Sequence, residues 1–312
     1  MSLTVLIAFG ANLLVAIAKS FAAVITGSAS MVAESAHSWA DTGNEVFLLV
    51  AERRSKRGPD QTHPLGYGKE AYIWSMFAAF GLFTAGAVVS IQHGIQELTD
   101  PEHSGEFGVA YAVLGFAFLL EGFSFVQAFR ATKSAARKRK RSIMRQVLVS
   151  SDPTTRAVFF EDAAALVGLA IAFLGVLLHQ LTGLAVFDAA GSILVGVLLG
   201  VVAVILIQRN RAFLLGVAVE GPVRDGVIRE LLSHAEISRV TYLHIEYVGP
   251  ERVLLVAAVD LAGNEEEDDV ARTLRRIALA IEQDEHVLEA VLTLSVAEDP
   301  AIVPLSPQQA GA

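Results

Sequence analysis

Four polar residues follow one another at helical spacing inside a stretch that is otherwise apolar or small. Glu34, His37, Asp41 and Asn44 are separated by three, four and three residues, so an α-helix places all four on one face. His37 and Asp41 stand one turn apart, where an imidazole and a carboxylate can bind the same ion. Imidazole with carboxylates suits zinc, and also iron, cobalt, nickel or manganese.

Two adjacent carboxylates, Glu161 and Asp162, interrupt a second apolar stretch, which runs from about 155 to 178. Neighbouring side chains on a helix point about 100° apart, so the two are not expected to face one partner. We assign Asp162 to the ion and expect Glu161 to face the stretch at 107–129 or a water-filled cavity.

Together these side chains form the predicted metal site. Zinc prefers four nitrogen or oxygen ligands in tetrahedral geometry, and His37, Asp41 and Asp162 provide three of them. The fourth position is open to Glu161, Glu121, Asn44 or water. A hydrogen-bond network that only joins helices is the alternative, and Glu121 has the further alternative of an ion pair with Lys19.

All of these residues lie in stretches that are long enough to cross a membrane. A helix needs roughly 20 apolar residues to cross the hydrocarbon core. Continuous apolar runs without period-two alternation predict six such helices, at about 4–25, 30–52, 72–96, 107–129, 155–178 and 186–208. A charged side chain in mid-bilayer costs at least ~3 kcal/mol, so each one needs a partner or a function.

The distribution of basic residues orients these helices. The segments 26–29, 97–106 and 179–185 contain no Lys or Arg, whereas 53–71 contains five and 130–154 contains eight. Cytoplasmic loops carry the excess of Lys and Arg. We therefore expect a multi-pass protein of the cell membrane, with both termini in the cytoplasm.

The composition excludes several classes of protein. The chain has no cysteine, which leaves no thiolate metal ligands. The net charge of −9 comes from the last third, because residues 209–312 hold 9 basic and 18 acidic side chains. Such a domain lacks the basic face of a nucleic-acid binder. No His-Glu-x-x-His or nucleophile motif is present, so we expect neither an enzyme nor a bound cofactor.

Three stretches resemble the cation diffusion facilitator family of divalent-metal/proton antiporters. They are 28–44 on the second predicted helix, 63–70 after it, and 187–196 at the start of the sixth. The pattern is most similar to the branch that includes the ninth human zinc-transporter-like protein, where a Leu-Glu-Asp-like pair resembles Phe160-Glu161-Asp162. The resemblance implies a proton-coupled transporter with six membrane helices and a cytoplasmic domain that dimerises.

The sequence departs from the family pattern at two places. Many members have a histidine four residues before the aspartate of the fifth helix, and here that position is Val158. Bacterial zinc antiporters have Asp, His and His at a second site after the second helix. Asp60 and His63 match two of these, and Tyr67 replaces the third. The alternative for this segment is a tight turn set by its Pro and Gly residues.

The acidic last third predicts a small α+β domain over about 211–298. Helical periodicity appears at 223–234 and 265–282, and strand-like runs appear at 240–248, 252–261 and 287–296. The order is therefore αββαβ. It follows a membrane domain over 1–210 and precedes a tail, 299–312, that is predicted to be disordered.

These observations predict a homodimeric membrane transporter that exports a divalent cation, first Zn²⁺, in exchange for protons. Metal binding needs neutral imidazole and ionised carboxylates, so protons and metal compete for one site. The alternatives are a Mn²⁺, Fe²⁺ or Co²⁺ exporter on the same site and a non-transporting membrane metal sensor or scaffold. The expected partners are the lipid bilayer, divalent cations, protons and a second copy of the chain.

Overall fold

The computed structural model describes residues 3–100 and 107–304. These residues group into two compact units. The membrane unit comprises Met1–Arg54 and Ala71–Arg211, and the C-terminal unit comprises Ser55–Glu70 and Ala212–Ala312. The segment 55–70 thus groups with the C-terminal unit, although it connects two helices of the membrane unit.

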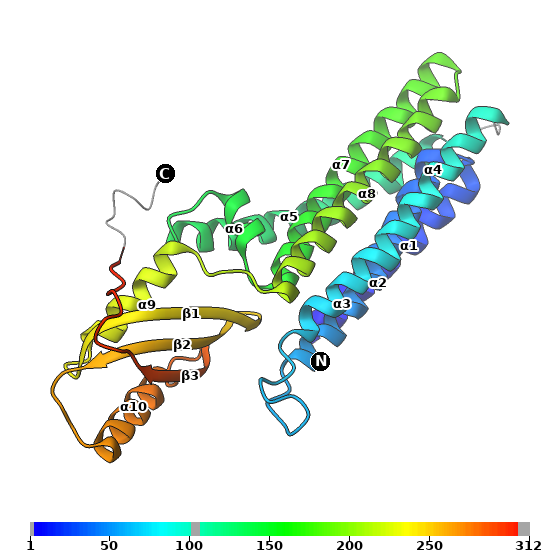
Figure 1. Ribbon diagram of the computed structural model, residues 1–312. Helices are drawn as coiled ribbons and strands as arrows, with labels where there is room; N and C mark the ends of the chain where they lie inside the picture. The colour runs from blue at the N-terminus through cyan, green and yellow to red at the C-terminus, as the bar shows by residue number, and fades with distance from the viewer. Residues whose placement is uncertain (1–2, 101–106, 305–312) are drawn as a thin grey trace. The chain divides into compact units, whose positions relative to one another are not determined.

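Long helices that run side by side build the membrane unit (Figure 1). Their bounds lie close to the six predicted spans: α1 (Leu3–Thr26), α2 (Ala29–Ser55), α3 (Glu70–Ala78) with α4 (Thr84–Thr99), α5 (Phe107–Lys138), α7 (Pro153–Thr182) and α8 (Val186–Leu215). A π-helical segment, η1 (Ala79–Phe83), joins α3 to α4. The short helix α6 (Ile143–Val149) lies in the basic segment predicted as a loop.

Length and composition separate these helices into two groups. Within the described residues, four segments are long and apolar enough to cross a membrane: Glu70–Thr99, Phe107–Lys138, Pro153–Thr182 and Val186–Leu215. Helix α1 contributes a further apolar stretch, Asn12–Thr26. The remaining long helix, α2, carries the polar stripe, and 13 of its residues, among them Glu34, His37 and Asn44, are buried inside the unit.

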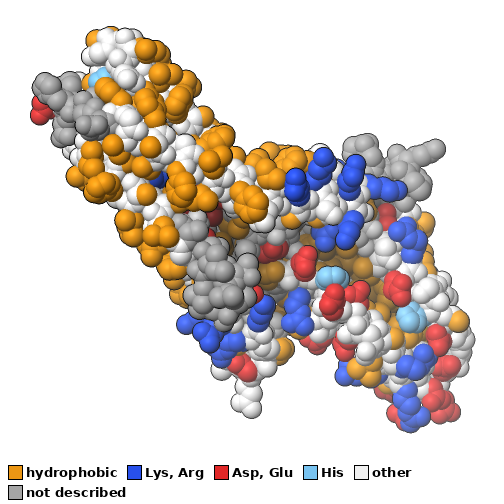
Figure 2. Space-filling view, turned by 180° about the vertical axis from the view of Figure 1, so that it is seen from behind, with side chains coloured by type: hydrophobic (Ala, Val, Ile, Leu, Met, Phe, Trp, Pro, Cys, Tyr) orange, Lys and Arg blue, Asp and Glu red, His pale blue; other side chains and the backbone are white. Residues whose placement is uncertain are grey.

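The outer surface of the membrane unit is apolar. Figure 2 shows hydrophobic side chains spread over these helices on the face in view. Val24 is 84% exposed and Leu119 is 72% exposed, which would be costly in water. Lipid tails are as apolar as leucine, so this surface fits a bilayer. The chain is therefore a multi-pass membrane protein.

Small residues allow the helices to approach closely. A Cβ built on Gly94 of α4 would lie 2.7 Å from Ala189 O of α8, and one on Gly196 would lie 2.9 Å from Ala87 O. Small residues at such contacts are typical of membrane helices, whose association depends on packing.

The N-terminus of α2 is held by α8. Asp188 Oδ1 accepts hydrogen bonds from Ser28 Oγ at 3.0 Å and from Ser30 N at 3.2 Å. A carboxylate that accepts from an N-terminal amide of a helix caps that helix. Asp188 therefore fixes the start of α2, which carries the polar stripe.

The C-terminal unit has the predicted αββαβ order. Its elements are α9 (Gly221–Ser233), β1 (Ile237–Gly249), β2 (Arg252–Leu261), α10 (Glu267–Ile281) and β3 (Val287–Leu294). The sheet order is β1-β2-β3, with β1 antiparallel to β2 and β2 parallel to β3. The core joins the helices to the sheet and contains Leu231, Val240, Leu255, Val259, Ile277 and Ala290. The prediction of a helical membrane domain followed by a small α+β domain is confirmed.

Two further segments belong to this unit. Lys69 Nζ lies 2.8 Å from Glu246 Oε1 of β1, and a Cβ on Gly68 would lie 2.4 Å from Val248 O, so only glycine fits there. The predicted tail, 299–312, is described as far as residue 304, and its remaining residues lie outside the described part. Ile302 N donates to Val240 O at 2.7 Å.

Candidate metal site in the membrane unit

A cavity of about 400 Å³ lies between α1, α2, α5 and α7. Apolar side chains form part of its wall, among them Val15, Leu48 and Val158. Its polar lining consists of Asn12, Ser38, Asp41, Glu45, Glu121, Ser124, Gln127, Glu161 and Asp162. The cavity thus brings together carboxylates from three helices that are far apart in the sequence.

The His37 and Asp41 side chains contact each other beside this cavity. His37 Nε2 lies 3.4 Å from Asp41 Oδ2, as their spacing on α2 predicts. His37 is fully buried, and among the described residues neither of its ring nitrogens has a hydrogen-bond partner. Asp41 Oδ1 is buried without a partner as well. An unpaired buried polar group costs about 1–3 kcal/mol, so these atoms are available to bind an ion or a water molecule.

A glycine on α7 makes room for this part of α2. A Cβ on Gly168 would lie 2.5 Å from Glu34 Oε1 and 3.5 Å from His37 Nδ1. Any larger residue would force either the Glu34 carboxylate or α7 to move. Glu161 and Asp162, which precede Gly168 by about two turns of α7, can therefore lie close to α2.

The two carboxylates of α7 take different partners. Asn44 Nδ2 of α2 donates a short hydrogen bond to Glu161 Oε1, and Ser124 Oγ of α5 donates to Asp162 Oδ2 at 2.9 Å. Glu161 lines the cavity, which is one of the two orientations expected for it, and Asp162 rather than Glu161 contacts the helix at 107–129. Helical periodicity gives the angle between the two side chains, whereas the rotation of α7 about its own axis, set by packing, decides which one faces α2.

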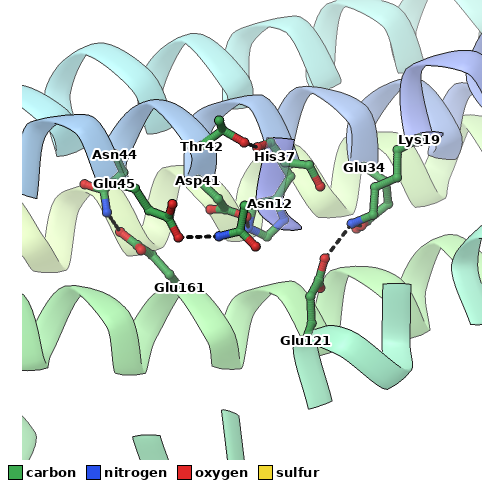
Figure 3. A network of polar contacts seen from close by, with 11 residues as sticks. Asn12, Lys19, Glu34, His37, Asp41, Thr42, Asn44, Glu45, Glu121 and Glu161 are labelled. Atoms are coloured by element: carbon green, nitrogen blue, oxygen red, sulfur yellow. Dashed lines mark hydrogen bonds and ion pairs between the residues drawn. The ribbon is translucent and has the colours of Figure 1, made fainter. Parts of the chain in front are cut away.

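A separate buried ion-pair group lies among the same helices. Lys19 Nζ of α1 lies 2.9 Å from Glu34 Oε2 of α2 and 2.8 Å from Glu121 Oε1 of α5 (Figure 3). The predicted pair between Lys19 and Glu121 is thus present, with Glu34 as a second anion. Burying these charges is tolerable because they compensate one another.

Asp60 and His63 belong to the C-terminal unit, in the segment that connects α2 to α3. Asp60 Oδ1 accepts from Thr62 N, Thr62 Oγ1 and His63 N at 2.9, 2.7 and 2.8 Å. Tyr67 Oη donates to Asp60 Oδ2 at 2.8 Å. The hydrogen bonds from Thr62, then Tyr67 and His63, hold the pKa of the exposed Asp60 carboxyl well below its usual value. This geometry matches the alternative of a tight turn.

The structure brings Asp41, Glu161, Asp162 and Glu121 to one cavity, with His37 against Asp41 and Asn44 against Glu161. In the described parts of the chain, no three His, Asp or Glu side chains already stand in a metal-coordinating arrangement. Binding of an ion at this cavity therefore requires side-chain movement.

Sequence reasoning missed five polar residues of the cavity, Asn12, Ser38, Glu45, Ser124 and Gln127, and two of them contact each other. Asn12 Nδ2 of α1 donates to Glu45 Oε1 of α2 at 2.6 Å (Figure 3). Glu45 follows Asp41 by one helical turn, so the spacing of the polar stripe could have identified it. Asn12 carries a weaker signal, because it is uncharged and the next polar residue of α1, Lys19, follows only two helical turns later.

Comparison with known proteins connects this arrangement to a family. The family model described as "Cation efflux transmembrane domain" matches residues 5–215. "Metal tolerance protein C4" from Arabidopsis thaliana is 36% identical over 233 residues, which is 75% of this chain and 51% of the relative.

Two vertebrate relatives carry a more specific name. "Proton-coupled zinc antiporter SLC30A9, mitochondrial" is 33% identical in Xenopus laevis, over 90% of this chain and 49% of the relative. In Homo sapiens it is 34% identical, over 78% of this chain and 43% of the relative. The chain spans about half the length of the curated relatives it matches. The family resemblance read from the sequence is confirmed.

Proposed function

The chain belongs to the cation efflux family, and on that premise we propose that it exports a divalent metal cation, with Zn²⁺ as the first candidate. The ion binds at the cavity between α2 and α7, on His37, Asp41 and Asp162, with Glu161 as the fourth ligand. The observation that carries this proposal is the unpaired state of His37 and Asp41 Oδ1 beside a cavity lined by carboxylates. A divalent cation satisfies both the unpaired atoms and the excess of negative charge.

Competition between protons and metal supplies the coupling. Metal binds to neutral imidazole and ionised carboxylates, so it releases protons when it binds. Protons that enter from the opposite side of the membrane occupy the same nitrogen and oxygen atoms and release the metal. One site that alternates between the two sides thus exchanges metal for protons.

The basic loops define which side of the membrane export starts from. Their excess of Lys and Arg assigns 53–71, 130–154 and both termini to the cytoplasmic side. Export then means movement from that side to the opposite one. In the cell we assign the protein to the plasma membrane as a homodimer, and the small α+β domain forms the dimer contact.

A second substrate group is favoured by the donor atoms of the cavity. Its carboxylates come from Asp41, Glu45, Glu121, Glu161 and Asp162, whereas His37 is the one imidazole beside them in the part of the chain that is described. Carboxylate oxygen suits Mn²⁺ better than it suits zinc, and imidazole with oxygen also suits Fe²⁺ and Co²⁺. A Mn²⁺, Fe²⁺ or Co²⁺ exporter on the same residues is therefore the alternative.

Flux measurements test the proposal. The full chain is reconstituted in proteoliposomes, and uptake of Zn²⁺, Mn²⁺, Fe²⁺ and Co²⁺ is followed at two imposed pH gradients. We expect flux of at least one metal to increase with the opposing proton gradient and to be lost in Asp41→Ala and Asp162→Ala. Unchanged flux in both variants would show that transport does not use the central site. Flux that does not depend on the pH gradient would show that transport is not coupled to protons. Metal binding without flux would favour a sensor.

A further inference from the structure

Six carboxylates in and beside the cavity divide into two groups by their partners. Glu34 and Glu121 share the ammonium of Lys19. Asp41, Glu45, Glu161 and Asp162 line the cavity, and within the described residues none of them has a Lys or Arg in ion-pair contact. Uncompensated negative charge is costly in a membrane, so the charge of this second group is neutralised by protons or by a metal cation.

Glu45 holds a particular position in the second group. It follows Asp41 by one turn of α2, a rise of about 6 Å, toward the helix end that carries Arg53 and Arg54. Both side chains line the same cavity. Glu45 therefore lies between the predicted metal ligands and the basic end of the helix.

The two oxygens of Glu45 differ in their surroundings. Oε1 accepts from Asn12 Nδ2 at 2.6 Å, which fixes the side chain (Figure 3). Oε2 is shielded from solvent and has no hydrogen-bond partner among the described residues. Asp41 Oδ1, one turn away, is buried and unpaired in the same way, and so are both nitrogens of His37, which is 0% exposed. Buried oxygen and nitrogen atoms without hydrogen-bond partners in the described part of the chain thus follow one another along α2, on Glu45, Asp41 and His37.

We propose that Glu45 binds the cation between the basic end of α2 and Asp41, as an additional ligand through which the ion reaches the central site. This proposal rests on the proposed function and adds a residue to it. The ion first contacts Glu45 Oε2, and then moves one helical turn to Asp41 and His37. Asn12 is a positioning residue, because it orients Glu45 by a hydrogen bond without touching the ion.

The competing explanation is that Glu45 and Asn12 only join α1 to α2. Polar side chains do form such interhelical contacts. A neutral glutamine would make the same contact, because its Oε1 accepts from Asn12 Nδ2 as the carboxylate does. Charge is needed for cation binding and is not needed for helix association, so substitutions can separate the two roles.

Three variants of the full chain make this separation. Glu45→Gln removes the charge and keeps the hydrogen-bond acceptor. Asn12→Ala removes the hydrogen bond and keeps the charge. Glu52→Gln is the matched control, because it removes an exposed carboxylate from the same helix. Thermal melting in detergent shows that each variant is folded.

The experiment measures metal uptake into proteoliposomes and equilibrium binding of Zn²⁺ and Mn²⁺ to the purified protein. We expect Glu45→Gln to raise both KM and Kd roughly tenfold, Asn12→Ala to raise them less, and Glu52→Gln to leave them unchanged. Values for Glu45→Gln within twofold of the parent would overturn the proposal. An equal effect of Asn12→Ala would also overturn it, because helix association would then explain both.

The parent protein distinguishes this failure from failure of the proposed function. If the parent transports metal and Glu45→Gln behaves like it, only the role of Glu45 is wrong. If the parent binds metal without transporting it, the export proposal is wrong and the Kd of Glu45→Gln still decides the role of Glu45. If the parent neither binds nor transports any of the metals, both proposals are wrong.

Discussion

Two regions of this chain place an aspartate beside a histidine. On α2, His37 Nε2 lies 3.4 Å from Asp41 Oδ2, and the histidine is fully buried. In the segment 55–70, His63 Nδ1 lies 3.7 Å from Asp60 Oδ1, and both side chains are exposed. By residue type and distance alone, the two pairs are nearly equivalent candidates for a metal site.

Their hydrogen bonds distinguish them. Both oxygens of Asp60 accept hydrogen bonds from the surrounding turn, whereas Asp41 Oδ1 and both nitrogens of His37 have no such partner among the described residues. Local donors already satisfy the exposed pair, and the buried pair remains unsatisfied. A site is therefore indicated by buried atoms that lack partners rather than by the residue types themselves.

The largest effect is expected from the ion-pair group that supports the buried region. Lys19→Met leaves Glu34 and Glu121 without their cation. Breaking a buried pair costs about 3–5 kcal/mol, so we expect little folded protein, measured by yield and thermal melting in detergent. The triple variant Lys19→Met, Glu34→Gln, Glu121→Gln removes all three charges and should recover much of the stability. Normal melting of Lys19→Met would contradict the role of this group.

A direct comparison of the two pairs is the next prediction. Asp41→Asn should reduce metal flux by about a hundredfold, which corresponds to roughly 2.7 kcal/mol, because it removes an unpaired ligand oxygen. Asp60→Asn should leave flux within about twofold of the parent, since it alters an exposed turn. Flux in proteoliposomes measures both. Equal losses would show that the exposed pair takes part in transport.

A smaller effect on stability and metal binding is expected from a substitution at the contact between α7 and α2. Gly168→Ala places a Cβ against Glu34 Oε1, at 2.5 Å in the undisturbed geometry, whereas Gly122→Ala meets its nearest neighbour, Leu166, at 3.9 Å. Overpacking costs about 1–3 kcal/mol. We expect lower thermal stability and weaker metal binding for Gly168→Ala alone. If both variants melt alike, α7 does not need a glycine at this position.

The smallest effect concerns the pH response of the exposed pair. Thr62→Ala with Tyr67→Phe removes donors that lower the pKa of Asp60, so this pKa should rise toward its ordinary value. A carboxyl pKa that folding lowers stabilises the turn above the unfolded pKa, and this contribution disappears as pH falls through the folded pKa. Titration of the Asp60 carboxyl carbon by NMR measures the shift. An unchanged pKa would mean that other groups set it.

Much of the fold could be predicted because its signals are local. The length of the apolar runs predicted the membrane helices, and runs of β-branched and aromatic residues predicted the strands, with β2 found at Arg252–Leu261 as expected. The helix α6 and the π-helical segment at Ala79–Phe83 were missed. The first is short and lies within a basic segment, and the second has no hydrophobic period that differs from that of an α-helix.

The sequence predicted which site residues share one face of a helix. It predicted less well which residues of different helices contact each other. The spacing of four residues on α2 predicted that His37 contacts Asp41, and the structure shows this contact. The partners of Glu161 and Asp162 depend on the rotation of α7, which the packing of several helices sets together. The contact of Asn12 with Glu45 joins two helices whose relative register has no sequence signal.

X-ray absorption at the zinc edge tests most directly whether the metal is held by the buried pair. The zinc-loaded full chain should show mixed nitrogen and oxygen ligands at ~2.0–2.1 Å, with the scattering that is typical of imidazole. That imidazole signal should disappear in His37→Ala and persist in His63→Ala. A signal that persists in His37→Ala and disappears in His63→Ala would contradict the assignment and place the metal at the exposed pair.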